Sequence, residues 1–258
     1  MDTISEQAIR ARLHTAVFGR TLEVWPSLDS TNTRCRALAQ AGAPEGTVVT
    51  ANAQSAGRGR RGRAFFSPAG GVYLSLLLRP PAGMDPGRIT CCGAVAAARA
   101  IHRVCGAQPQ IKWVNDLFLH GRKLCGILAE GEPAADGRLR WCVLGIGINV
   151  AAAAFPPSLQ PLVTTLENEG FTADRSALIA ALLEEWEHLY PAADGAMMAE
   201  YRQLSFLPGR TVTVLRGEEA FTAVAEEITD EGHLLVRTPE GERVELHSGE
   251  VSIQCTKM

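Results

Sequence analysis

Hydrophobic and polar positions follow two different patterns along the chain. Up to residue 207, segments with an apolar residue every three or four positions predict helices, and the short alternating or continuously apolar segments between them predict strands. From Pro208 onward only short β-rich segments occur, separated by turns that contain Gly and Glu. We therefore expect an α/β domain of the α+β type at residues 1–207 and a small closed β-barrel at residues 208–258.

The first domain is expected to be a mixed or antiparallel sheet with helices packed on it. Apolar spacing and capping residues predict helices at residues 3–16, 30–42, 88–105, 174–189 and 195–205. Strands are predicted at residues 21–25, 47–52, 72–80, 111–113, 117–120, 123–131 and 139–150, the last four as an antiparallel meander. The second domain is expected to contain strands at residues 211–215, 220–228, 233–238, 243–248 and 251–255.

Composition and charge exclude several classes of protein. With 46% hydrophobic and 21% charged residues, the chain has the composition of a globular protein rather than of a disordered one. It shows neither an apolar run long enough for a membrane helix nor a signal peptide, so a cytoplasmic location is expected. The net charge of −3 argues against a generally basic nucleic-acid binder. About twenty residues before the first predicted strand are too few for a helix-turn-helix domain, so no DNA binding is expected.

Cysteine and histidine positions indicate no metal site. The seven cysteines are odd in number and have no CxxC spacing, which predicts buried, reduced thiols rather than disulfides or bound zinc. The six histidines form no HExxH motif or i,i+4 pair, so each is expected to be structural or exposed. Cys125 lies in a candidate site but has no histidine near it in sequence, which favours packing over nucleophilic chemistry.

Residues 57–63, GRGRRGR, carry four positive charges and no acidic residue. Gly57 to Gly62 satisfies the dinucleotide-binding pattern GxGxxG, but the following residues 63–71 contain Pro and Gly and predict no helix, so that interpretation fails. RNA binding through an arginine-glycine segment requires repeats and a basic surround, which this chain lacks. Mutually repelling guanidinium groups on a permissive backbone instead predict a loop that binds phosphate or carboxylate.

A second cluster of polar residues lies in the predicted meander. Residues 112–116, KWVND, place a lysine before an Asn-Asp turn, and Lys123 precedes Gly126 in the next strand. Gly145 and Gly147 repeat that glycine pattern in the neighbouring strand. Glycines inside strands often mark a close approach of ligand or backbone, so these strands are expected to form a floor for a flat or narrow ligand.

Taken together, these motifs resemble those of the biotin protein ligases, the biotin–[acetyl-CoA-carboxylase] ligases. The resemblance covers nearly the whole chain. It rests on DSTN at residues 29–32, QSAGRGRRGR at 54–63, KWVND at 112–116, RKLCGIL at 122–128, GIGIN at 145–149 and the β-rich tail. It implies a catalytic domain related to class II tRNA synthetases, followed by an SH3-like barrel, in the form that lacks an N-terminal DNA-binding domain. The family's usual proline in KWPND is Val114 here, and a usual tryptophan after the arginine loop is Phe65.

The resemblance also implies an activity and the residues that carry it out. The activity is formation of biotinyl-5'-AMP from biotin and ATP with Mg²⁺, followed by transfer of biotin to a lysine of a biotin carboxyl carrier protein. Biotin would be bound by Ser30, Thr31, Asn32, Gln54, Gly57, Arg58, Gly59, Arg60, Lys123, Gly126, Gly145 and Gly147. ATP or the adenylate would be bound by Arg60, Arg61, Arg63, Phe65, Lys112, Asn115, Asp116 and Asn149. Arg60, Lys123 and Asp116 are the expected catalytic residues, and no dedicated protein site for a metal is expected.

Elementary chemistry is consistent with this assignment. Joining a carboxylate to a phosphate brings two anions together, so the cations Arg60, Arg61 and Lys123 would offset the charge that grows in the transition state. Residues 57–65 are expected to be mobile until an anion binds among the arginines. Three alternatives stay open: a lipoate ligase or octanoyltransferase of the same fold, a non-enzymatic RNA-binding module, and a core domain with an incidental arginine loop. We expect a monomer or a homodimer.

Overall fold

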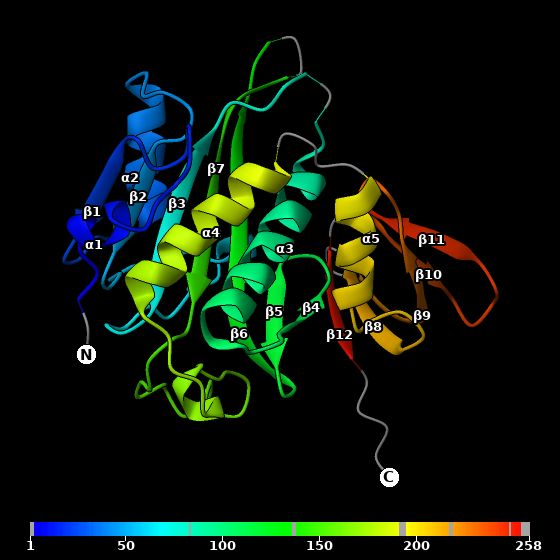
Figure 1. Ribbon diagram of the computed structural model, residues 1–258. Helices are drawn as coiled ribbons and strands as arrows, with labels where there is room; N and C mark the ends of the chain where they lie inside the picture. Colours follow the sequence, from blue (N-terminus) through cyan, green and yellow to red (C-terminus); the bar gives the residue numbers. More distant parts are fainter. Residues whose placement is uncertain are drawn as a thin grey trace.

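The computed structural model describes residues 3–82, 84–135, 138–190, 195–216, 219–247 and 249–253. These residues form two β-sheets, a seven-stranded and a five-stranded one, with most of the helices packed on the larger sheet (Figure 1). In this part of the chain no helix has both the length and the apolar composition needed to cross a bilayer.

The larger sheet has the strand order β1-β2-β3-β7-β6-β5-β4. Only β1 and β2 pair in parallel, and every other neighbouring pair is antiparallel, as expected for a mixed sheet with a meander. The strands are β1 (Leu22–Trp25), β2 (Val48–Ala51), β3 (Val72–Leu78), β4 (Gln110–Lys112), β5 (Asp116–Leu119), β6 (Arg122–Pro133) and β7 (Leu139–Ile148). The register places Gly126 of β6 opposite Gly147 of β7, and Ser75 of β3 opposite Gly145.

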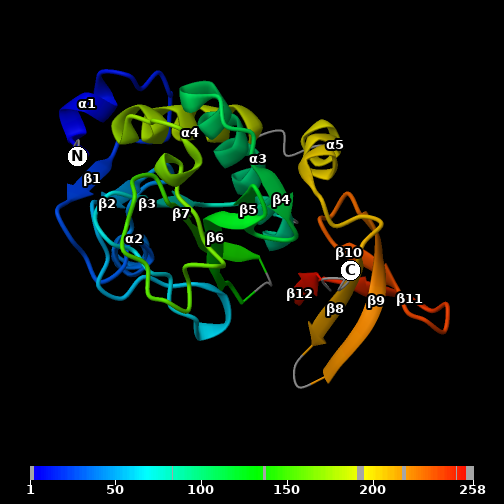
Figure 2. The ribbon, with the colours of Figure 1, turned by 90° about the horizontal axis from the view of Figure 1, so that it is seen from below.

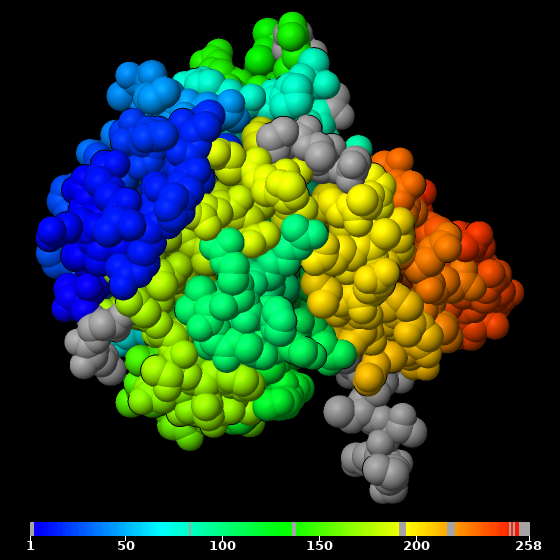
Figure 3. Space-filling view, in the orientation of Figure 1, coloured from blue at the N-terminus to red at the C-terminus, as the bar shows by residue number. Residues whose placement is uncertain are grey.

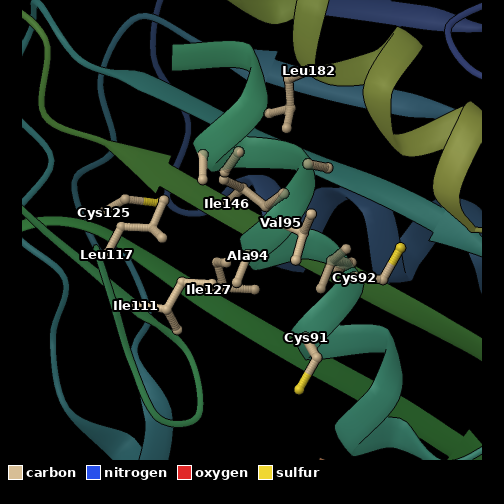
Figure 4. Close-up of a cluster of buried hydrophobic side chains, with 14 of the residues drawn as sticks. Cys91, Cys92, Ala94, Val95, Ile111, Leu117, Cys125, Ile127, Ile146 and Leu182 are labelled. Carbon is tan, nitrogen blue, oxygen red and sulfur yellow. The ribbon is translucent and has the colours of Figure 1, made fainter. Parts of the chain in front are cut away.

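Helices cover both faces of this sheet. The long helices α3 (Pro86–Cys105) and α4 (Arg175–Leu189) pack side by side on one face, and α2 (Thr31–Gln40) lies on the other (Figure 2). Figure 4 shows small side chains of α3, such as Ala94 and Val95, beside Ile127 and Ile146 of the sheet. Because small residues such as Ala and Cys predominate on the buried side of α3, the helix approaches the strands closely.

The N-terminal helix is shorter than the sequence predicted. Helix α1 spans Glu6–Arg10 rather than residues 3–16, and its N-cap is Ser5, whose hydroxyl accepts from the Ala8 N–H. The backbone N–H groups of residues 16–18 all donate to the carboxylate of Glu187 in α4. This tertiary contact satisfies the donors that a longer helix would have used internally, so the local helical pattern is overridden.

The smaller sheet is antiparallel and has the order β11-β10-β9-β8-β12. Its strands are β8 (Thr211–Arg216), β9 (Glu219–Ile228), β10 (Leu234–Arg237), β11 (Arg243–Leu246) and β12 (Glu250–Ile253). The sequence predicted a small barrel of five short strands, and the five strands are present, with β12 paired to β8 and with β11 and β12 as the outer strands in the pairings of the described residues. The part of the predicted last strand beyond Ile253 lies outside the described residues.

The smaller sheet packs against the larger unit beside α5 (Gly195–Leu204), as the space-filling view also shows (Figure 3). Trp113 Nε1 donates to the Gly232 carbonyl at 2.8 Å, and Arg202 donates to the Ile228 carbonyl at 3.1 Å. These bonds fix the β9–β10 turn on the larger unit, so residues of both sheets can line one site.

The described cysteines are free thiols, as the sequence predicted, and Cys255 lies outside the described residues. Cys35, Cys91, Cys92, Cys125 and Cys142 are buried. Desolvation raises the pKa of each of these thiols, to about 12 for Cys35 and Cys142. They are therefore held as packed, protonated thiols.

Candidate active site

Two adjoining cavities lie between α2, the arginine loop of residues 57–65 and the edge of the smaller sheet. Their volumes are about 50 Å³ and about 140 Å³. Five residues line both of them: Gly59, Arg60, Phe65, Asn115 and Lys123. A group bound in the first cavity and a group bound in the second would therefore meet at a wall that carries an arginine and a lysine.

The far end of the first cavity is built around Gln54. Its amide oxygen accepts from the Thr31 N–H at 2.8 Å and lies 3.1 Å from the Thr31 hydroxyl, while its amide nitrogen donates to Ser67 Oγ at 2.8 Å. The neighbouring Ser30 hydroxyl is buried and has no hydrogen-bond partner among the described residues. An unsatisfied buried hydroxyl in a cavity wall is available to a polar ligand.

Asn32 forms the side of the same cavity and depends on a glycine. Ser75 Oγ donates to Asn32 Oδ1 at 2.6 Å, and Asn32 Nδ2 donates to the Glu130 carboxylate at 2.8 Å. A Cβ atom at Gly145 would lie only 2.0 Å from Asn32 Oδ1. Glycine at this strand position therefore makes room for the asparagine side chain.

The glycine floor predicted from the sequence exists, but an aromatic ring covers it. Cβ atoms at Gly126 and Gly147 would lie 2.8 Å and 2.6 Å from the Phe65 ring. Phe65 therefore rests directly on the two strands, where a flat ligand had been expected. Lys123 Nζ lies 5.9 Å from the ring centroid, a cation–π contact that places the ammonium group beside the wall shared by the cavities.

The arginine loop folds back on itself. Phe65 N–H donates to the Gly57 carbonyl and Gly59 N–H donates to the Arg63 carbonyl, each at 2.8 Å. The tip contains Arg61 with φ of 56°, the left-handed region, followed by Gly62 with φ of 73°. A single 3₁₀ turn, η1 (Arg60–Gly62), occurs here rather than an α-helix, which confirms that the GxGxxG pattern is not a dinucleotide-binding fingerprint.

Two arginines of this loop are tied to other parts of the molecule. Arg58 Nη2 donates to Glu130 at 2.7 Å, the same carboxylate that accepts from Asn32. Arg60 Nη1 lies 3.2 Å from both Asn115 Oδ1 and the Gly249 carbonyl. Arg60 thus connects the loop, the end of the meander and the smaller sheet at the boundary between the cavities.

Asp116 and Lys123 form an ion pair across β5 and β6. Lys123 Nζ lies 2.7 Å from Asp116 Oδ1, and both side chains are mostly buried. The preceding Asn115 donates from Nδ2 to the Ile127 carbonyl at 2.9 Å, which fixes the turn. Among the described lining residues of both cavities, Asp116 is the only carboxylate. A hard divalent cation held mainly by phosphate oxygens would find its protein ligand here.

Most of the residues singled out in the sequence line one or both cavities. They are Ser30, Thr31, Asn32, Gln54, Arg58, Gly59, Arg60, Arg61, Arg63, Phe65, Lys112, Asn115, Asp116, Lys123, Gly126, Gly145 and Gly147. Two others do not. Asn149 is buried and donates to the Thr164 carbonyl at 3.1 Å, so its side chain supports a neighbouring loop. Gly57 allows the loop to close, because a Cβ atom there would lie 2.3 Å from the Phe65 carbonyl oxygen.

Sequence reasoning missed several residues of the site. Tyr73 lines the first cavity, and Trp113, Gly249 and Val251 line the second. Glu130 lines neither cavity, but its carboxylate accepts hydrogen bonds from Asn32 and Arg58, which line the first one. A carboxylate directly after the apolar run at residues 124–129 of β6 is a signal that could have identified Glu130. No local signal identifies Gly249 and Val251, which reach the cavity only because the two sheets dock.

Comparison with families of known proteins matches both parts of the chain. Residues 24–149 match the biotin/lipoate A/B protein ligase family, and residues 209–253 match the biotin protein ligase C terminal domain. The bifunctional ligase/repressor BirA of Bacillus subtilis is 36% identical, over 92% of this chain and 76% of its own length. The biotin–[acetyl-CoA-carboxylase] ligase of Mycobacterium tuberculosis is 32% identical, over 96% of this chain and 95% of its own.

A solved structure has the same fold and carries ligands. The biotin protein ligase of Aquifex aeolicus in complex with biotin and ATP superposes with a TM-score of 0.76 and 27% identity. The match covers 91% of this chain and 99% of that one. The architecture described above is thus shared over nearly the full length of both proteins.

Proposed function

This chain belongs to the biotin protein ligase family, and from that membership we propose which part of the site performs each step. The enzyme activates biotin with ATP to biotinyl-5'-AMP and transfers biotin to a lysine of a biotin carboxyl carrier protein. The observation that supports this most directly is the pair of cavities with a common wall of Arg60, Phe65, Asn115 and Lys123. A carboxylate from one side and an α-phosphate from the other can meet there.

The first cavity is the proposed biotin pocket. The Ser30 hydroxyl and the Thr31–Gln54 pair supply polar groups at its far end, suited to a ureido ring. Leu74 and Ile146 supply apolar wall on the way to Lys123. A ring system with one polar end and an alkyl carboxylate at the other matches this gradient from polar, through apolar, to cationic.

The second cavity is the proposed site for ATP and for the adenylate. Arg61, Arg63 and Lys112 provide positive charge for phosphates, and Trp113 and Phe65 provide aromatic surface. Asn149 was expected here, but its bond to Thr164 supports a positioning role for the strand end instead. The smaller sheet contributes Gly249 and Val251.

Activation forms a bond between a biotin carboxylate oxygen and the α-phosphorus, and breaks the bond to pyrophosphate. Negative charge increases on the phosphate oxygens during this displacement, so fixed cations lower the barrier. Arg60 and Lys123, both at the shared wall, are the proposed stabilising groups. In the transfer step a neutral lysine amine attacks the acyl carbon, an amide forms and AMP leaves. Asp116 is the proposed group that orients or deprotonates that amine, which requires it to part from Lys123.

Mg²⁺ fits the residues present. It prefers oxygen ligands, and typically one or two carboxylates together with substrate phosphates. Asp116 would be the carboxylate, and Asn115 supplies a nearby amide oxygen. When bound with ATP, the ion would supply neutralisation of phosphate charge.

Further assignments complete the proposal. Residues 1–207 form the catalytic domain and residues 208–258 the SH3-like domain, supported by the two separate sheets. The enzyme works in the cytoplasm, which agrees with free thiols among the described cysteines. It acts as a monomer or homodimer and does not bind DNA specifically.

The test is ATP–pyrophosphate exchange with purified protein. We expect exchange that requires both biotin and Mg²⁺, and none above background with lipoate or octanoate. A preference for the linear acids would assign the chain to the lipoate branch of the wider family. Retention on RNA without any exchange would instead favour a binding module. A salt-resistant footprint on promoter DNA would contradict the proposed absence of DNA binding.

A further inference from the structure

The structure brings together two histidines that the sequence treated as isolated. His233 precedes β10 and His247 follows β11, and the antiparallel register pairs Leu234 with Leu246 directly beside them. The two imidazole rings therefore face each other, with ring centroids 4.1 Å apart. Glu245 projects from the same face of β11 as His247 because side chains alternate along a strand.

We propose that His233, Glu245 and His247 form a binding site for a divalent transition-metal ion of the zinc type. One ligand atom from each residue lies within 4.8 Å of the others. Two imidazoles and one carboxylate are a ligand set typical of Zn²⁺, with the fourth position left to water. The oxygen-seeking Mg²⁺ that accompanies ATP would not compete for this set.

The environment of His233 prepares it as a ligand. Its side chain is only 9% exposed, and its Nδ1 lies 2.7 Å from Glu245 Oε1. On the opposite side of the ring, Nε2 faces Asp85 Oδ2 at 3.9 Å. Without an ion Nδ1–H donates to Glu245, so an ion bound at Nδ1 would displace this proton, and Asp85 is then the carboxylate that faces the N–H at Nε2.

The backbone around the site is fixed before any ion binds. Thr229 N–H donates to the His233 carbonyl at 2.9 Å, and His233 N–H donates to Thr229 Oγ1 at 3.2 Å. The adjacent Gly232 carbonyl accepts from Trp113. An ion would connect the start of β10 with the end of β11. These two strands already have the required register, so binding costs little conformational entropy.

The site has a position from which it can affect the enzyme. His247 lies two residues before Gly249, whose carbonyl accepts from Arg60 at 3.2 Å. A bound ion would restrain the segment that carries Gly249. It would also link the smaller sheet to the N-terminus of α3 through Asp85, whose Oδ1 caps that helix by accepting from Gly87 N–H.

The test uses full-length protein without a polyhistidine tag, from which metal ions have been removed with a chelator. Co²⁺ binding is followed by visible absorption and Zn²⁺ binding by calorimetry, both in the presence of Mg²⁺. We expect a single saturable equivalent with d–d bands and without a thiolate charge-transfer band. His247→Ala should abolish binding, and because His247 is exposed the fold should be retained. Asp85→Asn, which can still cap α3, should weaken binding by roughly 10–100-fold.

The matched control is His14→Ala. His14 is an exposed histidine whose Nδ1 also lies close to a glutamate, Glu184, at 2.9 Å. This variant should bind Co²⁺ and Zn²⁺ like the parent. Absence of saturable binding in the parent, unchanged binding in His247→Ala, or a thiolate band would overturn the proposal. Each outcome is independent of biotin ligation, so it leaves the proposed function untouched.

Discussion

Replacing Glu130 by Gln removes the negative charge that links the arginine loop to the first cavity. One Glu130 oxygen accepts from Asn32 and the other from Arg58. A glutamine oxygen can still accept from Asn32, but the amide NH₂ would then face the Arg58 guanidinium group. The substitution therefore breaks the ion pair while it preserves the side wall of the pocket.

The magnitude follows from burial and chemistry. The Arg58 and Glu130 side chains are 41% and 26% exposed, so their pair contributes to stability as a partly solvated ion pair does, by about 0–1 kcal/mol. In a chain of this size that lowers Tm by at most about 4 °C. In the ligand-bound state a charge-assisted hydrogen bond that holds the loop contributes about 1.5 kcal/mol, so its excess over the free state is about 0.5–1.5 kcal/mol, and its loss raises the Kd for biotin roughly 2- to 10-fold.

The Glu130→Gln substitution should weaken biotin binding rather than strengthen it. Arg58 uses Nη2 for Glu130, which leaves other N–H donors of the guanidinium group for an anion. Glu130 therefore orients Arg58 rather than withholding it from ligand. Calorimetry would measure the Kd for biotin, and thermal unfolding would measure stability.

Glu132→Gln is the matched control. It lies two residues further along β6, and its pair with Arg140, at 3.3 Å, is more exposed and remote from both cavities. Its Kd for biotin should equal that of the parent. An unchanged Kd in Glu130→Gln, tighter binding, or an equal effect in Glu132→Gln would refute the reasoning.

Four other outcomes are expected. Lys123→Ala should lower kcat/KM for pyrophosphate exchange by about 10²–10³-fold with a much smaller change in Tm, and equal losses would indicate a structural role. Gly145→Ala should weaken biotin binding because the new methyl group displaces Asn32. Calorimetry would measure the Kd for biotin, and an unchanged Kd would contradict this prediction. Hydrogen exchange in residues 57–65 should slow when biotin and a non-hydrolysable ATP analogue bind, whereas equal protection would indicate a preformed loop. Burial raises the pKa of Cys142 to about 12, so the unfolded chain alone releases this proton above about pH 8.5 and stability falls. In urea unfolding under reducing conditions, the parent should lose about 1.4 kcal/mol more than Cys142→Ala between about pH 7.5 and about pH 9.5, and parallel curves would contradict the linkage.

The sequence by itself determined the elements and the kind of chemistry. Hydrophobic residues that recur with periods of two and 3.6 residues located the strands and the long helices. They do so because side chains point in the same direction every two residues in a strand and every 3.6 residues in a helix. Gly106 ended α3 as predicted, with φ of 77°. The cationic loop and the strand glycines identified the site because their charge and missing side chains are properties of the residues themselves.

Only the tertiary structure decided which residues act together. Glu130 contacts Asn32 and Arg58, which lie 98 and 72 positions away, and Arg60 reaches Gly249 across 189 positions. Phe65 on the glycine floor depends on the register of β6 and β7, His233 opposite His247 depends on the register of β10 and β11, and the bond from Arg60 to Gly249 depends on docking of the two sheets. Register and docking are fixed by the sum of many weak packing contacts over the whole chain, so no local pattern encodes them.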